Sequence, residues 1–207
     1  MDKEYLMFKR SLSKGLKKMN LTDADIREAL IQKLKMENTK KSYRIIEEFV
    51  ICNGEARADV AIVNGIMKGF EIKSDVDSLL RLPNQIEKYD ATFDKCTIVV
   101  GYKFRKKIEN LIPEHWGILC AYKNRFGKVS LKNIRSATFN KNVTNKALLD
   151  LLWSSEIKSF LKNNKIRGYS NKNKFQLIEL MDANFRLPVV KSFTRETLKN
   201  RQDWRIA

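Results

Sequence analysis

Two alternating runs on either side of Asn64-Gly65 constrain the fold more than any other feature of the sequence. In residues 56–63 and 66–73, apolar side chains occupy mainly the even-numbered positions. Four charged side chains of the two runs, Arg57, Asp59, Glu71 and Lys73, occupy odd-numbered positions. Alternation with period two predicts two strands that point one face at a core and carry charge on the other.

The turn between these strands decides which residues share a face. A two-residue loop would pair residue 63 with residue 66, and it would place Asp59 opposite the apolar Phe70. A loop of odd length or a one-residue bulge pairs odd positions with odd positions and keeps Asp59, Glu71 and Lys73 together. Gly65 can take a positive φ. We therefore predict a bulged or three-residue hairpin.

The rest of the chain alternates between helical and strand periodicity. Helices are predicted over residues 23–36, 79–93, 147–162, 172–181 and 194–201, with Thr22 or Asp23 as the first N-cap. Further strands are predicted over residues 43–51, 96–100, 118–122 and 128–134. This order predicts an α/β fold with a central mixed β-sheet flanked by helices. We expect a core of residues 1–140 and a basic helical C-terminal region of residues 141–207.

The net charge of +17 in 207 residues favours a polyanionic partner. A generally lysine-rich composition is the alternative, and it would scatter Lys throughout the chain. The acidic residues instead gather between residues 47 and 94, whereas residues 95–207 are mainly basic. DNA is therefore the expected partner, with RNA second, and a homodimer is compatible with the sequence.

The compartment expected from the sequence is the cytoplasm. No apolar run approaches the roughly 18 residues that span a bilayer, and the charged N-terminal segment lacks the apolar stretch of a signal peptide. Cys52, Cys96 and Cys120 are scattered and odd in number, so we expect buried free thiols rather than disulfides or a zinc site.

Asp59, Glu71 and Lys73 form a pattern suited to phosphodiester chemistry. Carboxylates on adjacent strands can hold Mg²⁺, or Mn²⁺, beside a phosphate, and the backbone carbonyl of Ile72 can add a ligand. Lys73 would stabilise the charge that develops in the transition state. Glu48, or its neighbour Glu47, would complete the metal shell.

Residues 45–101 resemble the PD-(D/E)XK nuclease superfamily, which has the restriction-endonuclease-like fold. The resemblance rests on Asp59, on Glu71-Ile72-Lys73 and on Gln85, which is followed four residues later by Tyr89. Ala58 stands where the proline that names the motif would be. In small bacterial and phage members, two further features match Asp25-Ile26-Arg27 and Trp204-Arg205.

The resemblance implies a metal-dependent deoxyribonuclease in which metal-activated water attacks the phosphate. Its catalytic residues would be Asp59, Glu71, Lys73 and Gln85. Arg57, Arg81 and Tyr89 would contact the nucleic acid. A ribonuclease, or a nucleic-acid-binding protein that keeps the fold without catalysis, is the alternative. His115, the sole histidine, is expected to be structural, because this mechanism needs no histidine base.

Residues 157–181 loosely resemble SAP-type DNA-binding modules, in which two short helices flank a basic loop. Phosphate contacts are expected from the side chains of Lys165, Arg167, Lys172 and Lys174. The alternative is a helical cap on the core whose basic loop is simply solvated.

Overall fold

The computed structural model describes residues 20–202 and residue 204, which contain six strands and six α-helices. The charged N-terminal segment of residues 1–19 lies outside the described residues. The same holds for Arg205 of the Trp204-Arg205 pair. No helix in the described part combines the length and apolar character that a membrane crossing requires.

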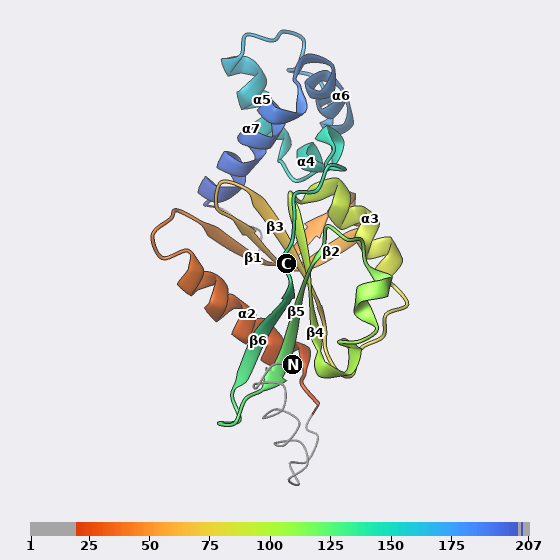
Figure 1. The fold of residues 1–207 in the computed structure, drawn as a ribbon. Helices are drawn as coiled ribbons and strands as arrows, with labels where there is room; N and C mark the ends of the chain where they lie inside the picture. Colours follow the sequence, from red (N-terminus) through yellow and green to blue (C-terminus); the bar gives the residue numbers. More distant parts are fainter. Residues whose placement is uncertain (1–19, 203, 205–207) are drawn as a thin grey trace.

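The six strands form one mixed sheet in the order in which they occur in the chain (Figure 1). They are β1 (Arg44–Ile51), β2 (Ala56–Val63), β3 (Met67–Lys73), β4 (Lys95–Gly101), β5 (Gly117–Lys123) and β6 (Val129–Arg135). β4 runs parallel to both β3 and β5, and the other neighbours are antiparallel. The predicted α/β class, mixed sheet and central apolar strand are confirmed.

The β2–β3 hairpin has the register predicted from the parity of its residues. Val63 pairs with Met67 and Val60 with Phe70, so the loop is residues 64–66. Gly65 has a φ of 101°, a left-handed conformation that glycine adopts without strain. Odd positions therefore face odd positions across the hairpin.

Helix α2 (Asp23–Glu37) covers one face of the sheet. Thr22 caps it in a capping box with Asp25, as the sequence predicted for the N-cap. Its buried side chains Ile26, Leu30 and Leu34 pack in an apolar cluster with even-numbered residues of β2 and β3. The spacing of four residues places them on one helix face.

Helix α3 (Leu82–Thr92) packs on the opposite face, which the odd-numbered residues of β2 and β3 share. A Cβ at Gly69 would overlap the Phe93 ring, so this glycine permits the close approach. Glu71 and Lys73 lie under α3 and are only 1% and 6% exposed. The odd-numbered face carries the expected charged residues, but α3 covers it, so both faces of these strands are buried.

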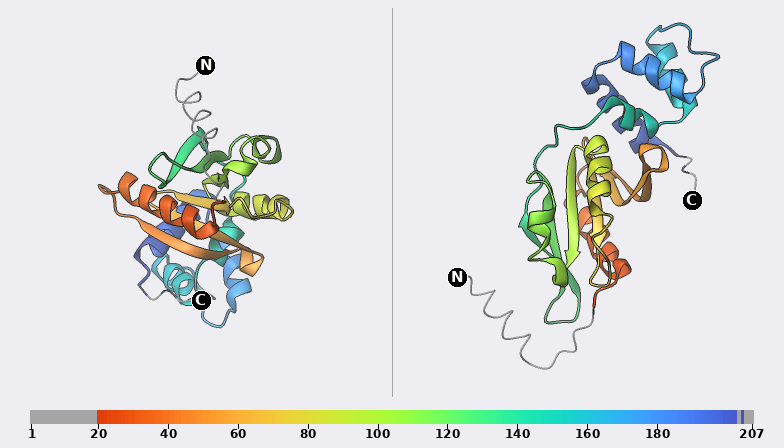
Figure 2. Two further views of the ribbon diagram at one scale, coloured as in Figure 1. Left: turned by 90° about the horizontal axis from the view of Figure 1, so that it is seen from below. Right: turned by 90° about the vertical axis from the view of Figure 1, so that its right-hand side faces the viewer.

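The C-terminal helices gather at one end of the sheet (Figure 2). They are α4 (Asn145–Asp150), α5 (Ser154–Asn163), α6 (Lys174–Asn184) and α7 (Leu187–Asn200). The single helix predicted over residues 147–162 is wrong. Trp153 is extended (φ −78°, ψ 151°), and its N–H donates to Glu156 Oε2 at 2.7 Å, which starts a new helix. All three cysteines are free thiols as expected, although Cys52 is only half-buried.

Asp94 joins the C-terminal helices to the sheet. Its Oδ2 accepts from the Met67 N–H at 2.7 Å, and its Oδ1 lies 2.8 Å from Arg195 Nη2 and 3.0 Å from Lys191 Nζ of α7. The Asp94 side chain is 4% exposed, so bulk water screens these pairs little. Apolar residues of the helices and of the α3 face form one continuous cluster.

Asp94→Ala is expected to destabilise the protein by about 3 kcal/mol, because it removes a buried acceptor and leaves two cations without their partner. Urea denaturation followed by tryptophan fluorescence measures the change. Glu179→Ala removes an exposed acid of α6 and is the matched control. Equal unfolding midpoints for the two variants would contradict this role of Asp94.

Candidate functional site

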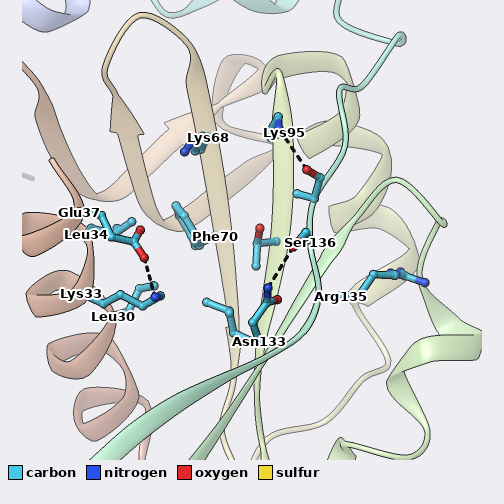
Figure 3. Close-up of a pocket in the computed structure, with 13 residues that line it drawn as sticks. Leu30, Lys33, Leu34, Glu37, Lys68, Phe70, Lys95, Asn133, Arg135 and Ser136 are labelled. Atoms are coloured by element: carbon cyan, nitrogen blue, oxygen red, sulfur yellow. Dashed lines mark hydrogen bonds and ion pairs between the residues drawn. The ribbon is translucent and has the colours of Figure 1, made fainter. Parts of the chain in front are cut away.

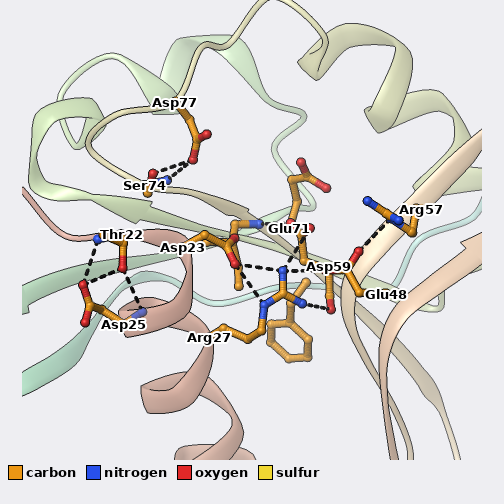
Figure 4. A network of polar contacts seen from close by, with 12 residues as sticks. Thr22, Asp23, Asp25, Arg27, Glu48, Arg57, Asp59, Glu71, Ser74 and Asp77 are labelled. Carbon is orange, nitrogen blue, oxygen red and sulfur yellow. Dashed lines mark hydrogen bonds and ion pairs between the residues drawn. The ribbon is translucent and has the colours of Figure 1, made fainter. Parts of the chain in front are cut away.

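The polar cluster around Asp59 lies where strands β2 and β3 separate. Their pairing ends at Val60 and Phe70, whereas β3 continues beside β4 to Lys73. Asp59 fills the opening, and its Oδ2 accepts from the Ile72 N–H at 2.6 Å (Figure 4). A side-chain carboxylate thus takes the place of a backbone carbonyl of β2.

Both oxygens of Glu71 are hydrogen-bonded inside the protein. Lys73 Nζ donates to Oε1 at 2.6 Å, and the Tyr89 hydroxyl donates to Oε2 at 2.7 Å. Lys73 Nζ also donates to Gln85 Oε1 at 3.0 Å. Gln85 and Tyr89 are one turn apart on α3, so the helix presents both to β3. The structure therefore brings together the four expected catalytic residues Asp59, Glu71, Lys73 and Gln85.

Arg27 of α2 is the central cation on the other side of Asp59. It donates to the Asp59 carbonyl at 2.6 Å and lies 3.5 Å from Asp59 Oδ1. Its Nη2 is also 2.9 Å from Asp23 Oδ1 and 2.8 Å from Glu48 Oε1. Arg27 belongs to the Asp25-Ile26-Arg27 tripeptide noted in the sequence, but no contact was predicted for its side chain. The spacing of four residues from Asp23 was the local signal that could have indicated its ion pair.

Burial and the charge of Glu71 raise the pKa of Asp59 to about 7. The Ile72 N–H and the Arg27 guanidinium act in the opposite direction, because both stabilise the carboxylate. Burial and the neighbouring carboxylates also raise the pKa of the Tyr89 hydroxyl well above its usual value. Tyr89 therefore stays a neutral donor to Glu71.

The cluster opens into a cavity of about 1040 Å³ between β2, β3 and α3. Asp59, Glu71 and Lys73 line its inner wall. Arg57 and Arg81 are exposed and lie at its edge, and Arg57 Nε is 2.7 Å from Glu48 Oε2. Tyr89, expected to contact nucleic acid, is fully buried and has no surface to offer, so that expectation is wrong.

The donors around the cavity fit a Mg²⁺ ion only loosely. The described residues include no group of three His, Cys, Asp or Glu side chains arranged to hold a metal. Glu48, the expected third acid, instead pairs with Arg27 and Arg57. Two carboxylates, Asp59 and Glu71, suit an ion that keeps most of its waters rather than a closed protein cage.

The other expected site residues lie elsewhere. Lys165, Arg167 and Lys172 are in the loop between α5 and α6, and Lys174 begins α6. His115 Nε2 is 2.9 Å from Asp90 Oδ1, which also accepts from the Trp116 indole N–H. This contact agrees with the structural role expected of His115.

Comparison with known proteins identifies a family that covers most of the chain. The family model for bacteriophage P4 protein cII matches residues 17–205. Protein cII of Enterobacteria phage P4 is 30% identical to this chain over 181 residues, which are 87% of this chain and 68% of that protein. No solved structure matches the chain.

These matches overturn the identification with the PD-(D/E)XK nuclease superfamily, and with it the expected hydrolysis of DNA or RNA. The motif spacing has a structural explanation of its own. Glu71 and Lys73 form a buried ion pair that α3 completes with Tyr89 and Gln85. Two residues at positions i and i+2 of a strand lie on the same face. The same spacing can therefore arise from a buried structural ion pair or from a catalytic motif.

Because its pKa is raised, the ionised form of Asp59 should reduce the free energy of unfolding at high pH in metal-free buffer. Because the folded-state pKa lies above the unfolded one, the group favours folding at low pH and loses that contribution as pH rises through about 7. Asp59→Asn should therefore stabilise the protein by about 1–3 kcal/mol at pH 8, with the gain gone near pH 4. Thermal unfolding at a series of pH values measures it.

Asp25→Asn is the control with the opposite sign. Hydrogen bonds from Thr22 lower the pKa of Asp25, so this carboxylate favours folding above its unfolded pKa. Asn at residue 25 should lower the unfolding temperature at pH 8. An Asp59→Asn variant that is equally destabilised at pH 4 and pH 8 would contradict the raised pKa of Asp59.

Proposed function

The chain belongs to the bacteriophage P4 protein cII family, and from that premise we propose that it is a regulatory protein that binds DNA without hydrolysing it. The observation that carries the proposal is the basic character of residues 157–178, here called the α5–α6 basic segment. It contains no Asp or Glu and six basic residues, which are Lys158, Lys162, Lys165, Arg167, Lys172 and Lys174.

Two of these lysines hold the segment in shape. Lys158 Nζ donates to the Ser170 carbonyl at 2.7 Å, and Lys174 Nζ donates to the Asp150 carbonyl at 2.7 Å. The turn itself uses positive φ at Lys165 (59°) and Gly168 (79°). The loop therefore has a defined path between the two helices.

The other four basic side chains have no hydrogen bond or ion pair within the described part of the chain. Lys162, Lys165 and Arg167 are exposed, and Lys172 is half-buried. They run from the last turn of α5, which contains Lys162, to the N-terminus of α6. Asn173 caps α6 by accepting from the Gln176 N–H at 3.0 Å. The positive end of that helix adds to the attraction for phosphate.

DNA is proposed over RNA because the helix–loop–helix arrangement resembles SAP-type DNA-binding modules. The net charge of +17 supports long-range attraction to the DNA backbone whatever the sequence. Contacts of this kind fix position on the duplex and carry no base specificity by themselves.

The proposed organisation is a core of residues 1–140 with a helical region of residues 141–207 as the DNA-binding part. The core is proposed to have a restriction-endonuclease-like arrangement without the activity. This finer fold proposal is supported by the β2–β3 hairpin, the parallel strand β4 and the flanking helices α2 and α3. The contacts of Asp94 with α7 support a fixed orientation of the two parts.

Mg²⁺ is proposed as a structural ion at Asp59 and Glu71. A divalent cation would offset the repulsion between these two carboxylates. We expect millimolar Mg²⁺ at pH 8 to raise the unfolding temperature of the wild type and to leave that of Asp59→Asn unchanged. An equal rise in unfolding temperature in both proteins would show that Mg²⁺ does not bind at Asp59.

The double variant Lys165→Gln/Arg167→Gln tests the DNA-binding proposal. Loss of two phosphate contacts should weaken binding to duplex DNA and reduce the slope of log K against log salt by about 2. Fluorescence anisotropy with a labelled duplex at several salt concentrations measures both. Lys106→Gln/Lys107→Gln removes the same charge from two exposed sites on the core and serves as the matched control.

The same duplex, recovered after incubation with Mg²⁺ and run on a denaturing gel, should remain intact. Cleavage that Asp59→Ala abolishes would overturn the non-enzymatic part of the proposal. Equal loss of affinity and slope in both double variants would overturn the assignment of the α5–α6 basic segment as the contact surface.

A further inference from the structure

A second cavity, of about 240 Å³, lies on the α2 face of the sheet (Figure 3). The last turns of α2 form one side, the first residues of β3 and β4 form the floor, and the end of β6 forms the other side. We call it the Lys68–Lys95 cavity, after the two lysines that line its floor. It shares no lining residue with the cavity at Asp59.

Lys68 and Lys95 are direct neighbours in the parallel register of β3 and β4. Both are half-buried and lie on the same face of the sheet, with Phe70 and Thr97 following two residues later. Like charges at neighbouring positions on one sheet face disfavour folding. Burial first, and the charge of Lys95 second, lower the pKa of Lys68. An anion bound between Lys68 and Lys95 would offset their mutual repulsion.

The charged side chains around the cavity differ in their partners. Lys33 pairs with Glu37 at 2.5 Å, and Lys95 Nζ donates to the Ala137 carbonyl at 3.1 Å. Arg135 turns away and donates to the carbonyls of Trp116 and Pro113. Lys68 alone among them has no hydrogen bond or ion pair within residues 20–202 and 204. Its ammonium group is therefore available to a ligand.

The remaining lining residues indicate the kind of ligand. Leu30, Leu34, Phe70 and Leu119 supply an apolar inner surface, and Thr97, Asn133 and Ser136 supply neutral polar groups. The one acid of the lining, Glu37, is already paired with Lys33, so Lys68 and Lys95 carry the excess positive charge. A small dianion attached to an organic group matches both the excess positive charge and the apolar surface.

We propose that the Lys68–Lys95 cavity binds a phosphate monoester, with Lys68 and Lys95 receiving the phosphate and the apolar wall receiving the attached organic group. A monoester carries more charge than the diester of a DNA backbone, and its phosphate is terminal, so it can approach Lys68 and Lys95 without a second ester chain. A free small molecule and the 5′-phosphorylated end of a nucleic acid both present this chemistry. The proposal does not depend on DNA binding by the α5–α6 basic segment.

Calorimetric titration of the full chain tests the proposal, with inorganic phosphate and adenosine 5′-monophosphate as probes and chloride holding the ionic strength constant. Both probes should bind, and adenosine should not. Lys68→Gln should weaken binding of both probes at least tenfold, whereas Lys68→Arg should retain it. Lys132→Gln removes an exposed charge of β6 that does not line the cavity, and this variant should bind like the wild type.

Thermal unfolding without ligand separates a lost site from a lost fold. Because Lys68→Gln relieves repulsion with Lys95, its unfolding temperature should equal or exceed that of the wild type. Absence of phosphate-dependent binding in the wild type, or full binding by Lys68→Gln, would overturn the proposal. Equal binding of adenosine and its monophosphate would also overturn it.

Competition between 5′-phosphorylated and 5′-hydroxyl oligonucleotides identifies the source of the monoester. A preference for the phosphorylated end that Lys68→Gln removes assigns the cavity to nucleic-acid termini. Binding of the mononucleotide without such a preference assigns it to a free small molecule.

Discussion

The register of the β2–β3 hairpin is the constraint on which both polar sites depend. Its three-residue loop pairs odd positions with odd positions, so Glu71 and Lys73 point toward α3 and Lys68 and Phe70 point toward α2. A slip of one residue would move each side chain to the opposite face. Glu71 would then lie among the leucines of α2, and Lys68 would lie against Phe93 and the α3 core. The free energy that fixes this register is the burial of apolar residues on both faces at once.

The buried Glu71–Lys73 pair illustrates how one arrangement can satisfy a sequence motif and a structural need. Removing two charges from water costs several kcal/mol per ion, and the cost is offset only when each remaining donor and acceptor finds a partner. Tyr89 and Gln85 supply those partners from α3, and Arg27 moderates the neighbouring Asp59 from α2. The cluster therefore ties two helices to the centre of the sheet. A fold can host different functions on such a framework, so the motif by itself does not decide the functional class.

Much of the fold could be predicted because its signals are local. Alternation located β2 and β3, a run of apolar residues located β4, and the expected N-cap at Thr22 or Asp23 marked the start of α2. The break between α4 and α5 was missed because apolar periodicity continues through residues 151–153. There the Trp153 N–H donates to the Glu156 carboxylate, and this contact caps the start of α5. Within the candidate site, parity along the strands placed Asp59, Glu71 and Lys73 on one face. The contacts of Arg27 and the pairing of Glu48 with arginine depend on how distant segments pack together.

The sequence by itself determined the strands, the hairpin parity and the excess of positive charge, because each follows from neighbouring residues or from composition. Only the tertiary structure decided which residues the charged side chains contact. Lys68 and Lys95 are separated by 26 intervening residues and become neighbours through the parallel register of β3 and β4. Asp94 meets Lys191 and Arg195 because α7 returns to the edge of the core. Contacts of this kind arise from the packing of distant segments, for which no local pattern carries the information.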